Sequence, residues 1–434
     1  MIQRIFLATL ILPALAILAG RPARAQGMGG VDGVSAVGEL KSPTGDIGVR
    51  LSESAVLHAG VTTEVGYDTN VFYNDTARVS SAIMRVLSSL EINNHARDGS
   101  ASSSVSYSLG ASLTYREYLN DDSNVKAQRA FNPSVGGALA LAPSSKFSFG
   151  LSDSFTRTEE PPFGPGTGTI TRSYNLGVAQ MRLAPGGGRI ATLLRYTNTL
   201  DYYENQELQY ASNMGHDLML DLSWKWLPKT ALYLQGGVGW VGYIDDLRVT
   251  QGRTDSFTYR VLAGVRGLIT PKLAISLGAG YSDASYDGSV GGPSGADSIS
   301  GAVELSYRLG ALTQFGLGYG HTFRNSPIVG TFYNVDSVYA GMNQLIASRL
   351  AIGLRGRYEY RRYDGIQSGG MTIERTDNVL TVGAQMDYFI KRWFYAGVVY
   401  ALTFNSSTET PATATVTGVD YAKHQILGRV GVLY

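Results

Sequence analysis

The sequence predicts an all-β fold, a transmembrane antiparallel up-and-down β-barrel of about eighteen strands, with sixteen as the lower bound. Three observations predict this fold. The chain opens with an export signal, strand-length segments alternate apolar and polar residues almost to its end, and short connections alternate with longer polar ones. A sheet that closes on itself can cross a lipid bilayer, because closure satisfies every backbone N–H and C=O group.

The N-terminus has the three parts of a cleaved signal peptide. Arg4 supplies a positive charge, an apolar run extends from Ile5 to Leu18, and Ala23-Arg24-Ala25 forms a cleavage site with small residues. The run is too short for a membrane-spanning helix. We therefore expect residues 1–25 to be a signal peptide and the mature chain to begin at Gln26.

The composition excludes several classes of protein. Glycine supplies 53 of 434 residues, well above the roughly 7% of average proteins. There are 27 tyrosines and no cysteines, so the chain has neither disulfides nor thiolate metal sites. The formal net charge is +1 without long single-sign blocks, which gives no electrostatic footprint for nucleic acid. Low charge, high glycine and high tyrosine in an exported chain favour β-structure at a membrane.

Alternation is clearest in residues 217–226, 257–269 and 350–362, where apolar residues occupy one face and charged residues the other. This pattern is typical of a barrel that is apolar towards lipid and polar towards its lumen. Aromatic residues near the strand ends are candidates for the interfacial girdles: Trp224, Trp226, Trp240, Phe257, Tyr307, Tyr319, Phe323, Tyr358, Tyr360, Phe394, Tyr400 and Phe404.

The connections predict the orientation of the barrel. Short turns are expected at 142–146, 184–189, 227–230, 270–272, 309–312, 347–349 and 390–392, and longer loops at 159–171, 204–211, 287–297, 364–376 and 405–419. Strict alternation of the two kinds indicates short periplasmic turns and longer extracellular loops, and an even strand number places both termini in the periplasm. No connection is long enough to resemble the inward-folded loop of general porins, which predicts a wide channel unless side chains or the N-terminal segment narrow it.

The mature chain divides into a segment of residues 26–57 and the outer-membrane barrel of residues 58–434. The first segment is glycine-rich and poorly periodic, and its role as a periplasmic tether, a partial plug or a partner-docking strand stays open.

The functional surface is expected to be the lumen. Alternation places these charged residues on its wall: Arg116, Lys225, Arg260, Arg266, Arg308, Arg355, Arg357, Arg361, Asp217, Asp221, Glu304, Glu359 and Asp387. One interpretation is a mixed-charge, slightly cationic pore lining that admits polar solutes. The other is structural, with arginines and carboxylates pairing across strands and merely solvating the inner wall.

No pattern points to catalysis. The five histidines, His58, His95, His216, His321 and His424, have no metal-ligand spacing. The sequence contains neither a G-x-S-x-G elbow nor a phosphate-binding loop. We therefore expect no enzyme activity, cofactor, metal or nucleic-acid partner.

Two segments resemble known features of outer-membrane proteins. The C-terminus, with Tyr434, Val432, Val430 and Ile426 on one face, resembles the signal that hands barrels to their assembly machinery. The string from Gly60 to Phe72, GVTTEVGYDTNVF, resembles the first strand of the β-barrel porin-2 family. Asp68 and Asn70 within it suit a strand-to-loop transition, because both residue types bond their own backbone in turns.

The resemblance implies a function and partners. Members of this family are often encoded with machinery for capsule or exopolysaccharide synthesis, and some pair with a periplasmic polysaccharide-export protein. The leading hypothesis is a passive conduit for a secreted polysaccharide in the outer membrane of a Gram-negative cell. In its lumen, Tyr233 and Tyr395 could stack on sugar rings. The main alternative is a general or solute-selective diffusion porin. A third reading is a structural or adhesive surface protein with a blocked lumen.

Overall fold

The computed structural model describes residues 48–52, 55–94, 104–161, 169–248, 252–287, 295–310, 312–326, 332–368, 371–410 and 420–434. The expected signal peptide and most of the expected N-terminal segment lie outside the described residues.

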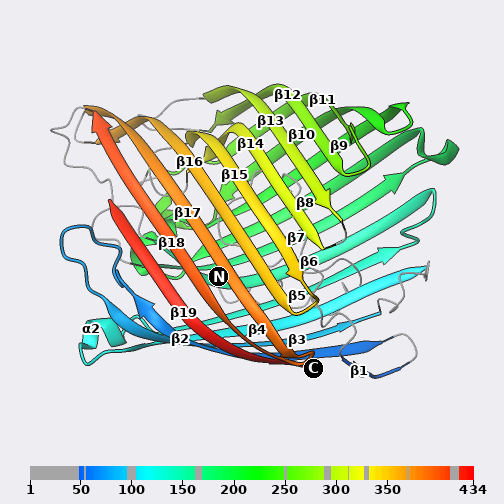
Figure 1. Ribbon diagram of the computed structural model, residues 1–434. Coiled ribbons are helices and arrows are strands. Elements are labelled where there is room, and N and C mark those ends of the chain that lie inside the picture. Colours follow the sequence, from blue (N-terminus) through cyan, green and yellow to red (C-terminus); the bar gives the residue numbers. More distant parts are fainter. Residues whose placement is uncertain are drawn as a thin grey trace.

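Eighteen long strands form one antiparallel sheet that closes into a barrel (Figure 1), which confirms the predicted fold. The long strands are β2 (Val56–Asp68), β3 (Ser81–Asn93), β4 (Val105–Leu119), β5 (Ala130–Leu141), β6 (Phe147–Glu160), β7 (Ile170–Leu183), β8 (Ile190–Tyr203), β9 (Asn213–Leu227), β10 (Thr230–Tyr243), β11 (Ser256–Leu268), β12 (Leu273–Tyr286), β13 (Gly295–Leu309), β14 (Thr313–Asn325), β15 (Phe332–Ile346), β16 (Leu350–Ser368), β17 (Met371–Lys391), β18 (Phe394–Thr410) and β19 (Tyr421–Leu433). Each pairs with its neighbours in sequence, so the order is up-and-down throughout.

Closure is made by β19 and β2, which pair from Gln425↔Asp68 to Leu433↔Gly60. Backbone hydrogen bonds between Ala59 and Tyr434, at 2.6 and 2.7 Å, extend this seam to the last residue. A short strand, β1 (Val49–Arg50), pairs with the beginning of β2 beyond that point. The barrel therefore begins ahead of the boundary expected at residue 58, because β2 is already paired at Val56.

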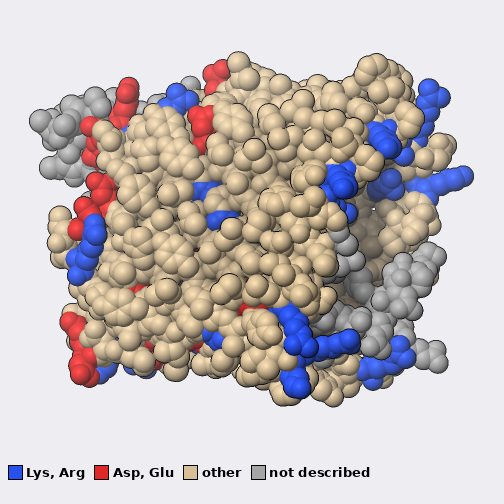
Figure 2. Space-filling view, viewed as in Figure 1, with Lys and Arg blue, Asp and Glu red and all other residues tan. Residues whose placement is uncertain are grey.

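The two faces of the sheet differ as the alternation predicts. On β9, Leu218, Leu220 and Leu222 are 40–45% exposed, whereas Asp221 between them is 4% exposed. On the face shown in Figure 2, charged side chains are correspondingly sparse between the two ends of the barrel. The C-terminal residues Ile426, Val430, Val432 and Tyr434 all lie on this exposed apolar face.

The two ends of the barrel carry different connections. We call the end with turns such as 228–229 and 347–349 the short-turn end, and the opposite one the loop end. Strict alternation of short and long connections was expected and is wrong at two places. The connection 94–104 at the short-turn end is long, and the expected loop 364–376 is instead taken up by the continued β16–β17 hairpin, which stays paired to Ser368↔Met371. β18 likewise extends to Thr410 through part of another expected loop. Antiparallel pairing persists there although the apolar alternation has ended, because backbone hydrogen bonds are independent of side-chain type.

In the part of the chain that the structure describes, helical structure is confined to connections. The helix α2 (Ser123–Lys126) and the 3-10 turns η2 (Gly186–Gly188), η3 (Gln206–Ala211) and η4 (Asp246–Arg248) join successive strands. Among the described residues, none of these helices has the length and apolar character that crossing a membrane would require.

Hydrogen bonds explain the polar residues at the end of the segment Gly60–Phe72. Asp68 and Asn70 are both fully buried, and Asp68 Oδ1 accepts a hydrogen bond from the backbone N–H of Asn70 at 3.0 Å. The Asn70 side chain donates to the carbonyl oxygens of Asn74 at 2.9 Å and Ala422 at 3.1 Å. These bonds tie the end of the first long strand to the last strand and to the loop that follows.

Gly66 provides a test of the seam. A Cβ at residue 66 would overlap the carbonyl oxygen of Ile426 and crowd Cα of Leu427 on β19. Gly66→Ala should therefore destabilise the barrel by about 1–3 kcal/mol, as overpacking does. Gly356→Ala, where a Cβ would meet no atom within 4 Å, is the matched control. The folded fraction on heat-modifiable gels measures both, and equal behaviour of the two variants would contradict the proposed role of the seam.

Candidate functional site

The thirteen charged residues predicted for the lumen all lie on the inner face of the barrel. Each occupies a strand position that alternates with exposed apolar residues of the outer face, as Lys225 does beside Trp224 and Trp226. Whether they contact a solute stays a prediction.

Most of the thirteen form ion pairs, as the structural interpretation expected. The ion pairs are Arg260–Asp217 at 2.8 Å, Arg266–Asp221 at 2.7 Å, Arg116–Glu159, Arg429–Asp387, and Glu359 with both Arg357 and Arg361. Lys225, Arg308, Arg355 and Glu304 have no ion pair among the described residues. The inner wall thus carries a network of ion pairs and a few charged side chains that have no ion pair to a described residue.

The densest part of this ion-pair network surrounds Glu359 on β16. Its carboxylate is 1% exposed and accepts a hydrogen bond from Nε of Arg361 at 2.9 Å. Nε of Arg357 lies 2.8 Å and a guanidinium nitrogen of Arg324 3.6 Å from the same carboxylate. A buried carboxylate among three guanidinium groups is well compensated, and removing it would leave buried like charges close together.

Sequence reasoning missed a second network, which lies inside the closing seam. Glu64 accepts from Nε of Arg85 at 2.7 Å and lies 3.7 Å from Arg429, which also donates to Asp387 at 2.6 Å. Nearby, Asp68 accepts from the hydroxyl of Tyr118 at 2.8 Å and lies 3.0 Å from Nζ of Lys423. The alternation of Glu64 with Val65 in β2 is the signal that could have placed the first of these residues inside.

Apolar clusters fill the inner wall at the loop end. Val71 and Val125, from the β2–β3 and β4–β5 connections, pack on the inward side chains Ile83, Tyr118 and Leu427. Leu208 and Ala211 of η3 pack in the same way on Ile170 and Tyr203. The sequence predicts no long inward-folded loop, and the connections that pack inward here are short. Short connections suffice because each carries one or two apolar residues that leave water by turning onto the wall.

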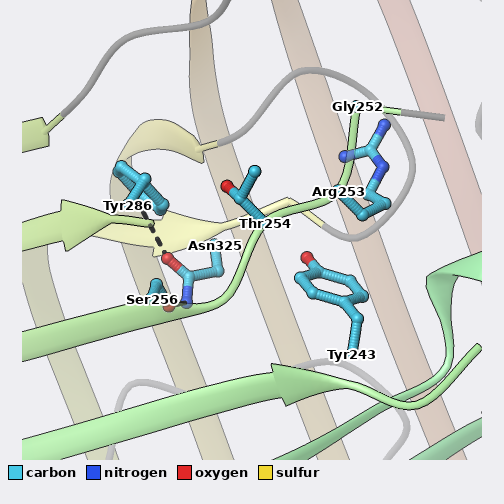
Figure 3. A pocket seen from close by; sticks show the side chains of 7 residues that line it. All are labelled: Tyr243, Gly252, Arg253, Thr254, Ser256, Tyr286 and Asn325. Atoms are coloured by element: carbon cyan, nitrogen blue, oxygen red, sulfur yellow. Dashed lines mark hydrogen bonds between the residues drawn. The ribbon is translucent and has the colours of Figure 1, made fainter. Parts of the chain in front are cut away.

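The loop-end part of the β14–β15 hairpin, residues 322–326 with Phe332, also bends inward, and we call these residues the tip. The ladder between β13 and β14 ends at Gly301↔His321, whereas β14 and β15 stay paired to Asn325↔Phe332. The freed tip crosses to earlier strands: Asn325 donates to the hydroxyl of Ser256 at 2.8 Å and accepts from Tyr286 at 3.1 Å. Figure 3 shows these residues around a small, closely filled pocket with Tyr243 and Arg253.

Aromatic packing holds this tip. Phe332 stacks on Tyr286 with ring centroids 5.9 Å apart and meets Phe323 edge-on at 6.4 Å. From the β10–β11 connection, Arg253 donates to the carbonyl of Ser326 at 3.0 Å. Phe323 was expected among the outer girdle residues, and this expectation is wrong, because the bend carries its ring into the inner cluster.

Outward tyrosines mark the loop end of the apolar surface. Each is hydrogen-bonded to a polar side chain that lies further towards the loop end: Tyr196–His216, Tyr319–Asp336, Tyr358–Asn378 and Tyr400–His424. Such rings with a polar partner on one side are typical of a membrane–water interface. This belt also accounts for two of the five scattered histidines, and among the described residues no group of three or more His, Asp or Glu side chains could hold a metal ion.

The short-turn end is basic. Figure 2 shows lysines and arginines gathered at the end where the short turns lie in Figure 1. Exposed cations stand on most of the short turns, namely Lys146, Arg189, Lys229, Lys272, Arg349, Lys391 and Arg392, and no described residue of these turns is Asp or Glu. The inward carboxylates Glu91 and Glu304 also lie in this half of the barrel. Inward cations without an ion pair to a described residue are Arg182, Lys225 and Arg308 near this end, with Arg195 and Arg355 deeper. Sequence reasoning found three of these five inward residues.

The arginines of β16 are expected to affect conduction differently, because some form ion pairs and others do not. Arg355 is exposed without an ion pair, whereas Arg361 is 8% exposed and bound to Glu359. Arg355→Gln should shift the reversal potential of a bilayer channel towards cations, because a free charge attracts mobile counter-ions. Arg361→Gln should change stability more than selectivity. A shift of equal size in both variants would contradict this division.

The inward tip predicts the width of the loop end. Replacing both Phe323 and Phe332 by Ala removes the rings that pack the tip on the wall, so single-channel conductance should rise by roughly twofold or become noisier as the tip is released. Phe404→Ala, on the exposed outer face, is the control and should leave conductance unchanged. Unaltered conductance in the double variant would mean that the tip does not narrow the channel.

Comparisons with known proteins place this geometry. No curated protein matches the sequence. Solved structures with similar architecture include a variant of the ferric enterobactin receptor PfeA from Pseudomonas aeruginosa, at 10% identity and a TM-score of 0.43 over 87% of this chain and 80% of that one. They also include the siderophore receptor PirA from Acinetobacter baumannii, at 9% identity and a TM-score of 0.44 over 87% and 80% of the two chains. OccAB4 from Acinetobacter baumannii aligns at 12% identity with a TM-score of 0.41 over 87% and 98%.

A family model described as putative beta-barrel porin 2 matches residues 211–432, from η3 to the last strand. The match covers half of the chain, in agreement with the resemblance carried by its first strand. The protein is an outer-membrane β-barrel that belongs to the putative beta-barrel porin 2 family.

Proposed function

We propose that the protein is a passive conduit through which a secreted polysaccharide leaves the cell across the outer membrane of a Gram-negative bacterium. The observation that carries this proposal is the difference between the two mouths. The loop end is lined by inward-packed connections and by the bent β14–β15 tip. Most of the connections at the short-turn end are tight turns. Since barrels of this kind place short turns in the periplasm, a chain from inside would meet the less obstructed mouth first.

Transport of this kind needs a polar wall and no chemistry. The inner face supplies charged and hydroxyl groups, and many of its charged side chains form ion pairs within a strand or between strands. Half-exposed Tyr233, whose ring lies 4.9 Å from the guanidinium of Arg266, is placed to touch passing sugar rings. Tyr395 is less suited than expected, because it is 8% exposed and packed in an apolar cluster.

The conduit would work with two kinds of protein partner besides outer-membrane lipid. A periplasmic polysaccharide-export protein would deliver the polymer to the short-turn mouth. The barrel assembly machinery would recognise β19, whose outward residues Ile426, Val430, Val432 and Tyr434 form a continuous apolar edge beside the closing seam.

A diffusion porin is the second candidate, and the narrowed loop end favours it. Apolar clusters that fix the outer mouth would set an upper size for solutes, as a constriction does in a porin. The third reading, a blocked structural barrel, is distinguished from both by the absence of ion conductance in a planar bilayer.

Polysaccharide secretion tests the leading proposal. A strain without this gene should lose extracellular polymer and accumulate it in the periplasm, and the intact gene should restore secretion. Complementation with Phe404→Ala serves as a control for expression of an altered barrel. Normal secretion in the deletion strain, together with slower uptake of small hydrophilic solutes, would establish the porin instead.

A further inference from the structure

We infer that the short-turn mouth takes in a polyanion, a polymer whose repeating unit carries carboxylate or sulfate groups. The inference rests on the proposed function, because it names the class of polymer that the conduit carries. It is built on the cations of the short-turn end, which the function as a conduit does not by itself require.

The short turns at the rim of this mouth carry cations, and none of their described residues is Asp or Glu. These cations are exposed, and none of them forms an ion pair with any described residue. A surface made only for solubility usually intersperses both signs, because like charges repel one another. A ring of unpaired cations around an opening raises the local concentration of anions there.

The positive charge continues into the lumen. Arg182, Lys225 and Arg308 lie one or two positions before the last residues of β7, β9 and β13, and point inwards. Arg195 and Arg355 lie five positions inside the ends of β8 and β16. At about 3.3 Å per residue and a strand tilt of about 40°, this depth is roughly 13 Å. We call these five residues the lumenal cations.

One lumenal cation carries an unsatisfied donor. Nε of Arg195, which lies opposite Gln180 and Met219 on the neighbouring strands, is buried and has no hydrogen-bond partner among the described residues. Buried donors are satisfied in the great majority of cases, so an open one on the wall of a conduit is explained when a passing acceptor supplies the bond.

The loop end provides the contrast. Buried arginines there form ion pairs with carboxylates: Arg172 with Asp201 and Glu160, Arg361 with Glu359, and Arg375 with Asp377 at 2.7 Å. Charges that are already paired attract a polymer weakly. Attraction for anions is therefore strong where the chain enters and weak where it leaves, which favours loading from the periplasm and release outside.

The recessed position of the lumenal cations decides between possible occupants. An acidic folded protein or the phosphate groups of the inner leaflet could pair with the turn residues at the rim. Neither could reach Arg195 or Arg355 inside the barrel, whereas an extended polymer chain reaches both. The proposal thus depends on the lumenal cations rather than on the rim.

Block of a bilayer channel by added polymers tests this inference. Polygalacturonate oligomers serve as the anionic probe and dextran of equal length as the neutral one. In 0.1 M KCl, polygalacturonate should block from the short-turn side at about tenfold lower concentration than from the loop side. The difference should shrink strongly in 1 M KCl, because salt screens the attraction. Dextran should show no such sidedness.

Two variants separate the lumen from other basic surfaces. In the lumenal variant, Arg182→Gln, Arg195→Gln, Lys225→Gln, Arg308→Gln and Arg355→Gln are combined, and the sidedness should disappear while conductance persists. The matched control combines Arg78→Gln, Lys126→Gln and Arg129→Gln at the loop end, where the block should stay as in the unaltered protein.

The outcomes distinguish this inference from the proposed function. Equal block from both sides, or sidedness that survives in the lumenal variant, would overturn the polyanion and leave a conduit for neutral polymer. A folded barrel without any conductance would instead overturn the conduit itself. If neutralising Lys146, Lys229, Lys272 and Lys391 stops secretion while the lumenal variant secretes normally, the rim docks an acidic partner and the inference fails.

Discussion

Pairing of β19 with β2 is the interaction on which the rest of the structure depends. Without it the sheet would have two open edges, and unpaired backbone groups are not tolerated in a lipid bilayer. The sequence around Asp68 serves this closure at several levels. Gly66 leaves room for the backbone of β19, Asn70 bonds to Ala422, and Asp68 holds Lys423 from the last strand. The motif that carries the family resemblance is thus explained by closure of the barrel.

Closure also defines two environments for charge. Outside, polar side chains at the tyrosine belt hydrogen-bond with the outward tyrosines. Inside, carboxylates such as Glu359 and Asp387 are held by arginines of the same and neighbouring strands. Ion pairs of this kind occur in both halves of the wall, since Asp387–Arg429 and Asp221–Arg266 lie in the short-turn half. The halves differ in that several inward cations of the short-turn half have no ion pair among the described residues.

The loop end shows how a barrel with short connections can still narrow its own mouth. Val71, Val125 and Leu208 each turn one apolar side chain onto the inner wall, and the β14–β15 tip leaves its neighbour β13 to pack on β12. Burial of apolar area, which needs no particular loop length, is sufficient to drive these contacts. The width of this end and the charge of the other therefore depend on different side chains.

The sequence by itself determined the barrel, its approximate strand number, and which residues face inwards, because period-two alternation is a local property of each strand. It therefore placed Arg355 and Glu359 on the lumen wall without knowledge of any neighbour. It could not determine which charges are paired, since Arg429 and Asp387 meet only through the register of two strands. Nor could it find the inward bend that carries the ring of Phe323 into an inner cluster, or the hydrogen bond from Asn70 to Ala422 across the seam. These features join residues far apart in the chain, so only the closed tertiary structure decided them.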